Sequence, residues 1–487
     1  ATGTFYVSPK SDINVTGSLE VVAGGDVTIS SDATHSGSLI VSGTATGAIS
    51  YQKHIPDDNW HFVSAPVETQ SINAFIVDAA NGIPTSVTNN YGVSTYNNAN
   101  AAGTRWEYEN TSTTPVGNFT TGKGYSNKRT AAGYYTFKGT MATADVVVTT
   151  ASSTAHKWEV VGNPYPSFLP ANNNANGTNN ILAHNIDNLE AEYKYLSFWD
   201  GAEYQVINHA ADAIHITPGQ AFMVRASANG ATFTFPENLQ TAQVAATTTS
   251  YRVTETPEVT LSLLSGTVTK TTTLKYFSNT TTGLDPGYDA GAFDQDTALS
   301  SRLVEDNQGT NFAINAMGLE SAYNQSVPLI INQSMGQTFR IDISQNTLPE
   351  NVNVYIEDIL ENTFTPIIGK DFELTAQSDL NEEGRFQIIF TTQTLGDVLN
   401  TNNVLNTDTV SIFKANNQDF ITIAGIASTA STTTASLYNM LGMSLLTKTL
   451  NNTTQTQSIS TQGLAKGVYV VQLKVGNAMF SKKVLVQ

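Results

Sequence analysis

Acidic residues gather in one turn-rich stretch, GLDPGYDAGAFDQD, and are the side chains best suited to bind a metal ion. The four carboxylates belong to Asp285, Asp289, Asp294 and Asp296. Oxygen-rich turns that contain Gly can wrap Ca²⁺, which takes about six to eight oxygen ligands. The EF-hand spacing is absent, however, and Asp and Gly also make ordinary turns. Calcium at these four residues is therefore one hypothesis, and solvated turns are the other.

The histidines are scattered and do not form a metal-binding motif. They are His35, His54, His61, His156, His184, His209 and His215, and none has HExxH or similar ligand spacing. The sequence also contains no GxSxG elbow, P-loop or complete GxGxxG. We therefore expect a protein that is not an enzyme, with no cofactor other than the calcium considered above.

Aromatic residues in the first half of the chain offer a second kind of chemistry, because exposed rings can stack on sugar rings. The candidates are Trp106, Tyr108, Tyr134, Tyr135, Trp199 and Tyr204. In β-rich proteins most such rings fill the core instead. An exposed aromatic strip beside a cleft would favour carbohydrate binding or glycan processing, and rings wholly in the core would exclude them.

Composition narrows the class of protein. The 487 residues include 23 basic and 41 acidic side chains, a net charge of -18, which argues against a nucleic-acid partner. There is no Cys, so disulfides, thiolate metal sites and Cys nucleophiles are excluded. No apolar run approaches the roughly 18 residues of a transmembrane segment. The chain starts at Ala1 without Met or an apolar leader, so we expect a mature product whose signal peptide has been removed.

The N-terminal segment, residues 1–50, alternates short apolar runs with Gly and with Asp/Ser turns. This period-2 pattern predicts short strands that form a few rungs of a solenoid-like sheet. A small stack of this kind is only marginally stable alone. We therefore expect it to pack on the domain that follows.

Residues 51–245 contain an internal repeat, with units at about 56–145 and 156–240. DNWHFVSAP lines up with HKWEVVGNP, and TTGKGY lines up with TPGQAF. The repeat predicts two duplicated β units that build a β-sandwich domain. Trp60 and Trp158 would be equivalent core anchors.

Further strand patterns separated by turn clusters occupy residues 250–395 and predict a second β-sandwich domain. Residues 396–410 lose the alternation and indicate a polar linker. The helix-permissive stretch 179–195 is short and has no evident cap. The predicted fold class is all-β, with tandem jelly-roll or Ig-like sandwiches and a last domain at 411–487.

The last domain shows tight turns between apolar strands. Leu437, Leu441 and Leu445 are expected to line one buried face. Alternation from Val468 to Leu473 places Tyr469, Val471 and Leu473 on one side and Val468, Val470 and Gln472 on the other. By pattern alone this is a small β-sandwich of about seven strands.

This ending resembles the type A C-terminal sorting domain of the type IX secretion system of Bacteroidetes. The matching residues are Leu437, Tyr438, Asn439, Gly442, Gly463, Leu464, Gly467, Tyr469, Val471, Lys482, Lys483 and Val484. Met443 stands where the family usually has a basic residue. The resemblance implies periplasmic transit, recognition by an outer-membrane shuttle barrel and the translocon, and removal of the tail by a surface sortase that couples the protein to lipopolysaccharide.

The rest of the chain is similar to uncharacterised flavobacterial surface proteins that carry this sorting domain, through the duplicated Trp units and the VPLIIN and VYIEDILEN blocks. The sequence thus predicts a protein displayed at the cell surface or released outside the cell. The predicted role is that of an adhesin-like or structural protein, with gliding motility as one setting. The alternative is a carbohydrate-binding or glycan-processing accessory protein secreted by the same route.

Overall fold

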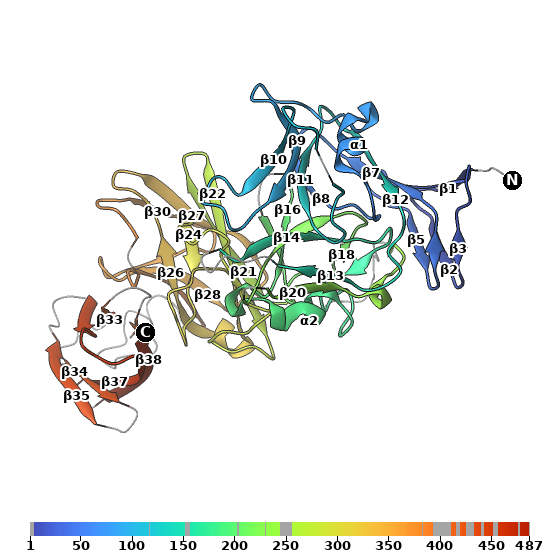
Figure 1. The fold of residues 1–487 in the computed structure, drawn as a ribbon. Coiled ribbons are helices and arrows are strands. Elements are labelled where there is room, and N and C mark those ends of the chain that lie inside the picture. Colours follow the sequence, from blue (N-terminus) through green and yellow to red (C-terminus); the bar gives the residue numbers. More distant parts are fainter. Residues whose placement is uncertain are drawn as a thin grey trace. The chain divides into compact units, whose positions relative to one another are not determined.

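The computed structural model describes the chain in thirteen segments: residues 4–115, 117–150, 156–201, 204–228, 230–243, 256–381, 383–392, 411–414, 419–424, 433–439, 443–450, 456–475 and 478–486. The chain divides into two compact units, Ala1–Tyr251 and Arg252–Gln487. Nearly all regular structure in both units is β (Figure 1), so the all-β prediction is confirmed. The predicted linker 396–410 lies outside the described residues.

The first unit begins with a short parallel solenoid. Its strands are β1 (Thr4–Val7), β2 (Asp12–Val15), β3 (Leu19–Glu20), β4 (Asp26–Ser30), β5 (Ser38–Val41), β6 (Ala45–Thr46) and β7 (Ile49–Ile55). Strand β1 pairs in parallel with β4, β2 with β5, β3 with β6, and β4 with β7, so each rung stacks on the next. The solenoid-like prediction holds, and β7 carries the stack into the following domain because it also pairs with β12.

The first repeat follows directly. Its elements after β7 are β8 (Trp60–Val63), α1 (Ile72–Val77), the 3-10 helix η1 (Ala79–Asn81), β9 (Asn90–Tyr96), β10 (Trp106–Asn110), β11 (Tyr125–Lys128) and β12 (Gly133–Gly139). Four strands form a sheet in the order β10-β9-β11-β8, while β7 pairs with β12. Val63, Phe75 and Phe137 belong to the core that this repeat shares with the solenoid.

The second repeat has the same plan. Its elements are β13 (Val146–Thr149), β14 (Trp158–Gly162), β15 (Leu169–Pro170), α2 (Ile181–Asn185), η2 (Ile186–Asn188), η3 (Ala191–Tyr193), β16 (Leu196–Trp199), β17 (Tyr204–Ile207), β18 (His215–Ile216), β19 (Ala221–Arg225), β20 (Thr232–Phe235) and η4 (Glu237–Leu239). The sheet order β17-β16-β19-β14 matches β10-β9-β11-β8 strand for strand, and the β13–β20 pair corresponds to β7–β12. The sequence repeat is therefore also a structural repeat.

The helices of the two repeats correspond as well. The Ser71 side chain caps α1 by accepting from the Ala74 amide at 3.2 Å, and the Asn180 side chain caps α2 by accepting from the Ala183 amide at 2.8 Å. The expectation that residues 179–195 are uncapped is therefore wrong. The capping signal was present in the sequence, but one turn of helix is too short to give an apolar periodicity.

Reciprocal contacts join the two repeats. The Ser64 amide donates to the Gly219 carbonyl at 3.0 Å, and the Gly162 amide at the equivalent position donates to the Gly122 carbonyl at 2.9 Å. Gly122 and Gly219 both have positive φ, 79° and 65°, which Gly adopts without strain. The shared TxGx[GA][YF] pattern thus marks two equivalent turns, each of which bonds to the other repeat.

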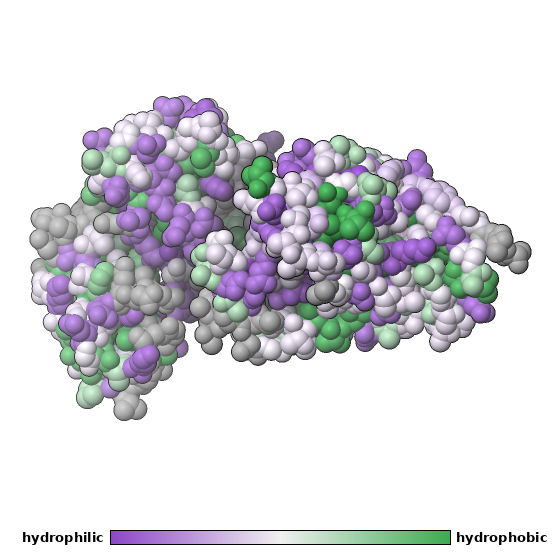
Figure 2. Space-filling model, turned by 45° about the horizontal axis from the view of Figure 1, so that its top comes forward, coloured by the Kyte–Doolittle hydropathy of each residue, from purple (hydrophilic) through white to green (hydrophobic). Residues whose placement is uncertain are grey.

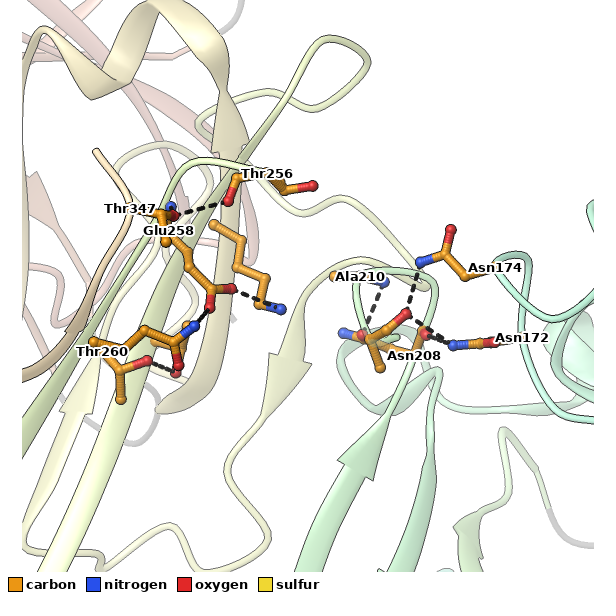
Figure 3. Close-up of polar contacts among 12 residues, drawn as sticks. Asn172, Asn174, Asn208, Ala210, Thr256, Glu258, Thr260 and Thr347 are labelled. Atoms are coloured by element: carbon orange, nitrogen blue, oxygen red, sulfur yellow. Dashed lines mark hydrogen bonds and ion pairs between the residues drawn. The ribbon is translucent and has the colours of Figure 1, made fainter. Parts of the chain in front are cut away.

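Buried Asn side chains hold several long loops of the second repeat. Asn172 donates to the carbonyls of Asn208 at 3.0 Å, Ala211 at 3.0 Å and Asp212 at 2.8 Å (Figure 3). An amide suits this role because it supplies donors and acceptors that replace water for buried backbone groups. Polar residues in these loops are therefore structural rather than simply solvated.

The second unit opens with one large sheet. Its elements are β21 (Glu258–Ser265), β22 (Val268–Phe277), β23 (Ala290–Gly291), β24 (Leu299–Ser301), β25 (Phe312–Gly318), η5 (Leu319–Ala322), β26 (Asn324–Ile331), β27 (Thr338–Asn346), β28 (Asn353–Asp358), β29 (Thr363–Pro366), β30 (Phe372–Thr375) and β31 (Phe386–Thr391). The sheet has 11 strands, and residues from distant strands such as Leu263, Ile356 and Phe390 share one core. On β21, Glu258, which is labelled in Figure 3, pairs with Lys275 at 2.8 Å and accepts from Gln345.

The described part of 411–487 contains two smaller sheets. The strands are β32 (Ser411–Phe413), β33 (Phe420–Ala424), β34 (Thr433–Asn439), β35 (Ser444–Leu450), β36 (Thr456–Ser460), β37 (Gly467–Val475) and β38 (Ala478–Val486). They pair in the orders β32-β33-β36 and β35-β34-β37-β38. Their buried residues, which include Ile421, Leu437 and Val471, form one core cluster, as in a sandwich.

Two expectations for this last domain have different outcomes. Tyr469, Val471 and Leu473 are buried while Val468 is exposed, so the predicted alternation of β37 is confirmed. Leu445 was expected on the buried face but is 39% exposed. It lies on β35, an edge strand whose residues are exposed up to Leu450. Leu441 lies outside the described residues.

Candidate functional site

The outer face of the first repeat's sheet carries aromatic side chains on its two edge strands. On β8 these are Trp60 and Phe62, and on β10 they are Trp106 and Tyr108. The central strands β9 and β11 place the small residues Gly92, Ser94 and Ser126 between them. Rings at the edges can therefore lean over a floor of small residues.

The rings meet in pairs across this floor. Trp60 and Tyr108 have ring centroids 5.6 Å apart at 66°, and Phe62 and Trp106 are 5.4 Å apart. Both separations lie within the range of favourable aromatic contacts. The paired rings hold each other in place, so the exposed faces are presented in a fixed orientation.

The second repeat completes this surface. Tyr204 of β17 lies 6.1 Å from Phe62 and 5.0 Å from Trp199 of β16. The Trp199 indole Nε1 donates to the carbonyl of Trp60 at 3.0 Å. Burial raises the pKa of Tyr204 to about 12, so its phenol stays protonated at neutral pH. The site is thus assembled from both repeats.

Two adjacent hollows open on this surface. The first, which we call the aromatic pocket, has a volume of about 200 Å³ and is lined by Trp60, Phe62, Trp106, Tyr108, Ser126, Trp199 and Tyr204. The second, the Lys128 pocket, has a volume of about 370 Å³ and is lined by Trp60, Pro84, Thr85, Ser86, Thr88, Asn90, Tyr91, Gly92, Tyr108 and Lys128. Trp60 and Tyr108 line both, so the two pockets adjoin at one ring pair.

The structure separates the six predicted aromatic candidates. Trp106, Tyr108, Trp199 and Tyr204 converge on the aromatic pocket. Tyr135 is fully buried in the core of the first repeat, and Tyr134 is 42% exposed on β12, where it contacts His54. On the face shown in Figure 2, separate hydrophobic clusters lie among hydrophilic residues.

Sequence reasoning missed Trp60, Phe62 and Lys128 as site residues. Trp158 is 3% exposed and is a core residue as predicted, but Trp60 is only partly buried, so its role as an equivalent core anchor is wrong. The reason lies in the neighbours: Tyr193 and Tyr195 pack on Trp158 at 5.7 and 6.1 Å, whereas Trp60 borders two open pockets. The repeat alignment was the available signal.

Three of the four candidate calcium ligands, Asp285, Asp289 and Asp294, accept hydrogen bonds from backbone amides. Asp289 accepts from the amides of Ala316 at 2.7 Å and Asp285 at 2.6 Å, and burial raises its pKa to about 7. Asp285 accepts from Thr281, and Asp294 accepts from the amide of Asp296. Within the described residues, no three or more His, Cys, Asp or Glu side chains are grouped to hold a metal ion. The calcium site stays a prediction to which this geometry adds nothing.

The residues that resemble a sorting signal have mainly structural positions. Leu437, Tyr469, Val471 and Val484 are buried, and Leu464 packs against the same core. Gly463 has a φ of 84°, Asn439 accepts from the Met443 amide at 3.0 Å, and Tyr438 donates to Gln472 at 3.4 Å. Gly467 starts β37, while Lys482 is partly exposed and Lys483 exposed on β38. Gly442 lies outside the described residues.

Comparison with known families identifies the ending first. A family model described as the secretion system C-terminal sorting domain matches residues 415–487. The chain is therefore cargo of the type IX secretion system, and this tail implies delivery to the cell surface or the extracellular space. No helix in the described part of the chain is long and apolar enough to cross a membrane.

The larger part of the chain matches a second family. A model described as a domain of unknown function, DUF8693, covers residues 1–390, and the chain belongs to this family. No curated protein matches the chain. A solved structure titled "Biofilm associated protein - BSP domain" shares 9% identity, with 88% of this chain and 90% of that chain covered and a TM-score of 0.19. A likeness this weak carries no argument about fold or function.

Proposed function

We propose that this type IX cargo is a non-catalytic, adhesin-like protein that acts at the cell surface by binding carbohydrate. The observation that carries the proposal is the aromatic pocket: rings from both repeats, spaced in sequence from Trp60 to Tyr204, converge on one exposed surface. This arrangement favours carbohydrate binding, the alternative drawn from the sequence. An adhesin-like protein can act through such binding, so the proposal combines both hypotheses.

The chemistry of the two pockets fits a sugar better than a purely apolar ligand. A pyranose has an apolar C–H face that can pack on a ring, and hydroxyl groups at its edge that need hydrogen-bond partners. The rim supplies both, since Trp60 and Tyr108 stand beside Thr85, Asn90 and Ser126. Two adjoining pockets would accept neighbouring residues of one glycan chain.

Export supplies the setting for this binding. We propose that the tail engages the outer-membrane shuttle barrel and the translocon, and that a surface sortase removes it and couples the protein to lipopolysaccharide. A glycan-binding protein held on the surface in this way would attach the cell to a polysaccharide or to a neighbouring cell. Attachment during gliding is one process that such a protein would serve.

Glycan binding is tested by screening the full-length protein on a glycan array and then measuring affinity by calorimetry. Tyr108→Ala should weaken binding of any glycan found by about tenfold, since each aromatic pair is worth about 0.5–1.5 kcal/mol beyond its buried area. Tyr134→Ala is the matched control, because Tyr134 is 42% exposed and Tyr108 is 43% exposed. Equal loss in both variants, or no glycan bound, would contradict the proposal.

Export and processing are tested by cell fractionation of tagged protein with and without residues 411–487, combined with intact mass of the surface form. We expect the full chain to reach the surface shortened close to residue 410 and the truncated chain to stay in the periplasm. Surface protein of full mass would leave export intact but remove the sortase and lipopolysaccharide from the proposal.

A further inference from the structure

Lys128 is the one basic residue lining the two pockets. It is the last residue of β11 and lies directly opposite Trp60 of β8 in the sheet register. Its side chain lines the larger pocket together with Trp60 and Tyr108. Within the described part of the chain, no carboxylate lies within ion-pair distance of its ammonium group. A cation that borders an aromatic hollow and has no acidic partner is available to a ligand.

In the second repeat, other side chains pack against the basic residue at the position equivalent to Lys128. Arg225 of β19 lies opposite Trp158 of β14, as Lys128 lies opposite Trp60. The Arg225 guanidinium forms an ion pair with Glu190 and lies 4.1 Å from the Tyr193 ring centroid. A carboxylate and a flat ring of the chain itself therefore occupy the place that stands open in the first repeat.

Lys157 pairs with the same carboxylate of Glu190. Its ammonium lies 2.7 Å from Glu190 Oε1, so one carboxylate is held between two cations. In the first repeat the equivalent segment lies between η1 and β9 and includes Pro84, Thr85 and Ser86, which line the pocket. It contributes no acidic side chain to the pocket lining. The first repeat thus keeps the cation and the Trp but lacks the carboxylate.

Nearby acidic residues do not neutralise Lys128. On β10, Trp106 and Tyr108 line the pockets, whereas neither Glu107 nor Glu109 lines either of them. Glu107 accepts hydrogen bonds from Asn97 and Asn100. The chain's net charge of -18 repels anions at long range, but salt screens this repulsion beyond about 10 Å. Recognition of an anion here would depend on direct contact.

We propose that the Lys128 pocket binds an acidic sugar residue, a uronate, whose carboxylate pairs with Lys128 while its C–H face packs on Trp60 and Tyr108. The inference rests on the proposed glycan-binding function and specifies the class of glycan. The neighbouring aromatic pocket has no charged lining residue and takes the adjoining sugar by stacking. The second repeat binds no sugar at the equivalent place, because Glu190 and Tyr193 fill it.

The test compares two linear hexasaccharides that differ only in charge: a hexauronate and its carboxyl-reduced form, in which every carboxylate is replaced by a hydroxymethyl group. Affinities are measured by calorimetry with the full-length protein. Lys128→Met keeps most of the side-chain length and removes the charge. We expect it to weaken hexauronate binding about fivefold and to leave binding of the reduced form unchanged, as for loss of one partly exposed ion pair.

Lys138→Met is the matched control, since Lys138 is an exposed lysine of the same repeat on β12. It should change neither affinity, although it alters the net charge of the protein by the same amount. The affinity of the unaltered protein for the hexauronate should also fall as salt is raised from about 50 to 300 mM, and Lys128→Met should flatten that dependence.

The outcomes separate the two proposals. Equal affinity for both hexasaccharides, or equal effects of Lys128→Met and Lys138→Met, overturns the acidic-sugar inference. Glycan binding still stands in that case if Tyr108→Ala weakens it and Tyr134→Ala does not. Binding of some other neutral glycan, with no binding of the hexauronate, has the same meaning. Failure to bind any glycan overturns both proposals.

Discussion

The two repeats of the first unit share one strand order but differ at the same place. Each sets a Trp opposite a basic residue, Trp60 opposite Lys128 and Trp158 opposite Arg225. In the second repeat Glu190 and aromatic rings close over this pair, and in the first repeat the pair borders an open pocket. A duplicated scaffold can therefore keep one copy for stability and leave the other free for binding.

The largest expected effect comes from removing the buried Trp of the second repeat, the copy in which Glu190 and Tyr193 cover the pair of Trp158 and Arg225. Trp158→Ala removes a fully packed side chain from the core and should lower the free energy of unfolding by about 3–5 kcal/mol. Trp60→Ala should cost only about 1–2 kcal/mol because its ring is partly exposed. Urea unfolding followed by fluorescence measures both. Similar losses for the two variants would contradict the distinction between a closed and an open copy.

The second effect concerns pH and again singles out the second repeat. Burial lowers the pKa of His209 to about 4, whereas the unfolded chain titrates near 6.5. The unfolded state binds the proton first, so stability is lost as pH falls from about 6.5 towards 4.

Between pH 7 and pH 4.5, the free energy of unfolding should fall by roughly 2 kcal/mol less in His209→Gln than in the unaltered protein. The measurement is urea unfolding at both pH values, with His54→Gln in the first repeat as control. An unchanged pH dependence in His209→Gln would show that this burial does not govern acid stability.

A smaller effect is expected from removing the ion pairs that Glu190 forms in the second repeat. Glu190→Gln keeps the shape but leaves Arg225 and Lys157 without their carboxylate, and the side chain of Glu190 is 20% exposed. We expect a loss of about 1–2 kcal/mol in unfolding free energy, most of it at low salt. Thermal unfolding at two salt concentrations tests this. A loss that does not depend on salt would mean that packing, rather than charge, closes the second copy.

Much of this comparison was accessible from sequence, and the decisive part was not. The alignment of Trp60 with Trp158 gives the repeat, because both residues begin equivalent strands. It cannot show that Tyr193 covers one Trp and that nothing equivalent covers the other, since this depends on loops that differ between the copies. Strand alternation in β37 was predictable because one face is buried. Exposure of Leu445 was not, because the sequence does not mark β35 as an edge strand.

The candidate site shows the same limit in a different form. Four of its rings were identified as possible sugar-binding residues, but the same reasoning included Tyr135, which is buried. Rings on neighbouring strands look alike in sequence, and only the sheet order decides which of them share a face. Lys128 carried no signal of its own until its register partner was known.

The exchanged hydrogen bonds at Gly122 and Gly219 have a consequence for the construction of the molecule. The Ser64 amide of the first repeat donates to Gly219 of the second, and the Gly162 amide of the second repeat donates to Gly122 of the first. Such reciprocity is the rule in a two-fold homodimer, where one surface patch meets its own copy. The first unit therefore has the construction of a two-fold dimer whose subunits are joined in one polypeptide, and equivalent places in its two halves can differ in sequence.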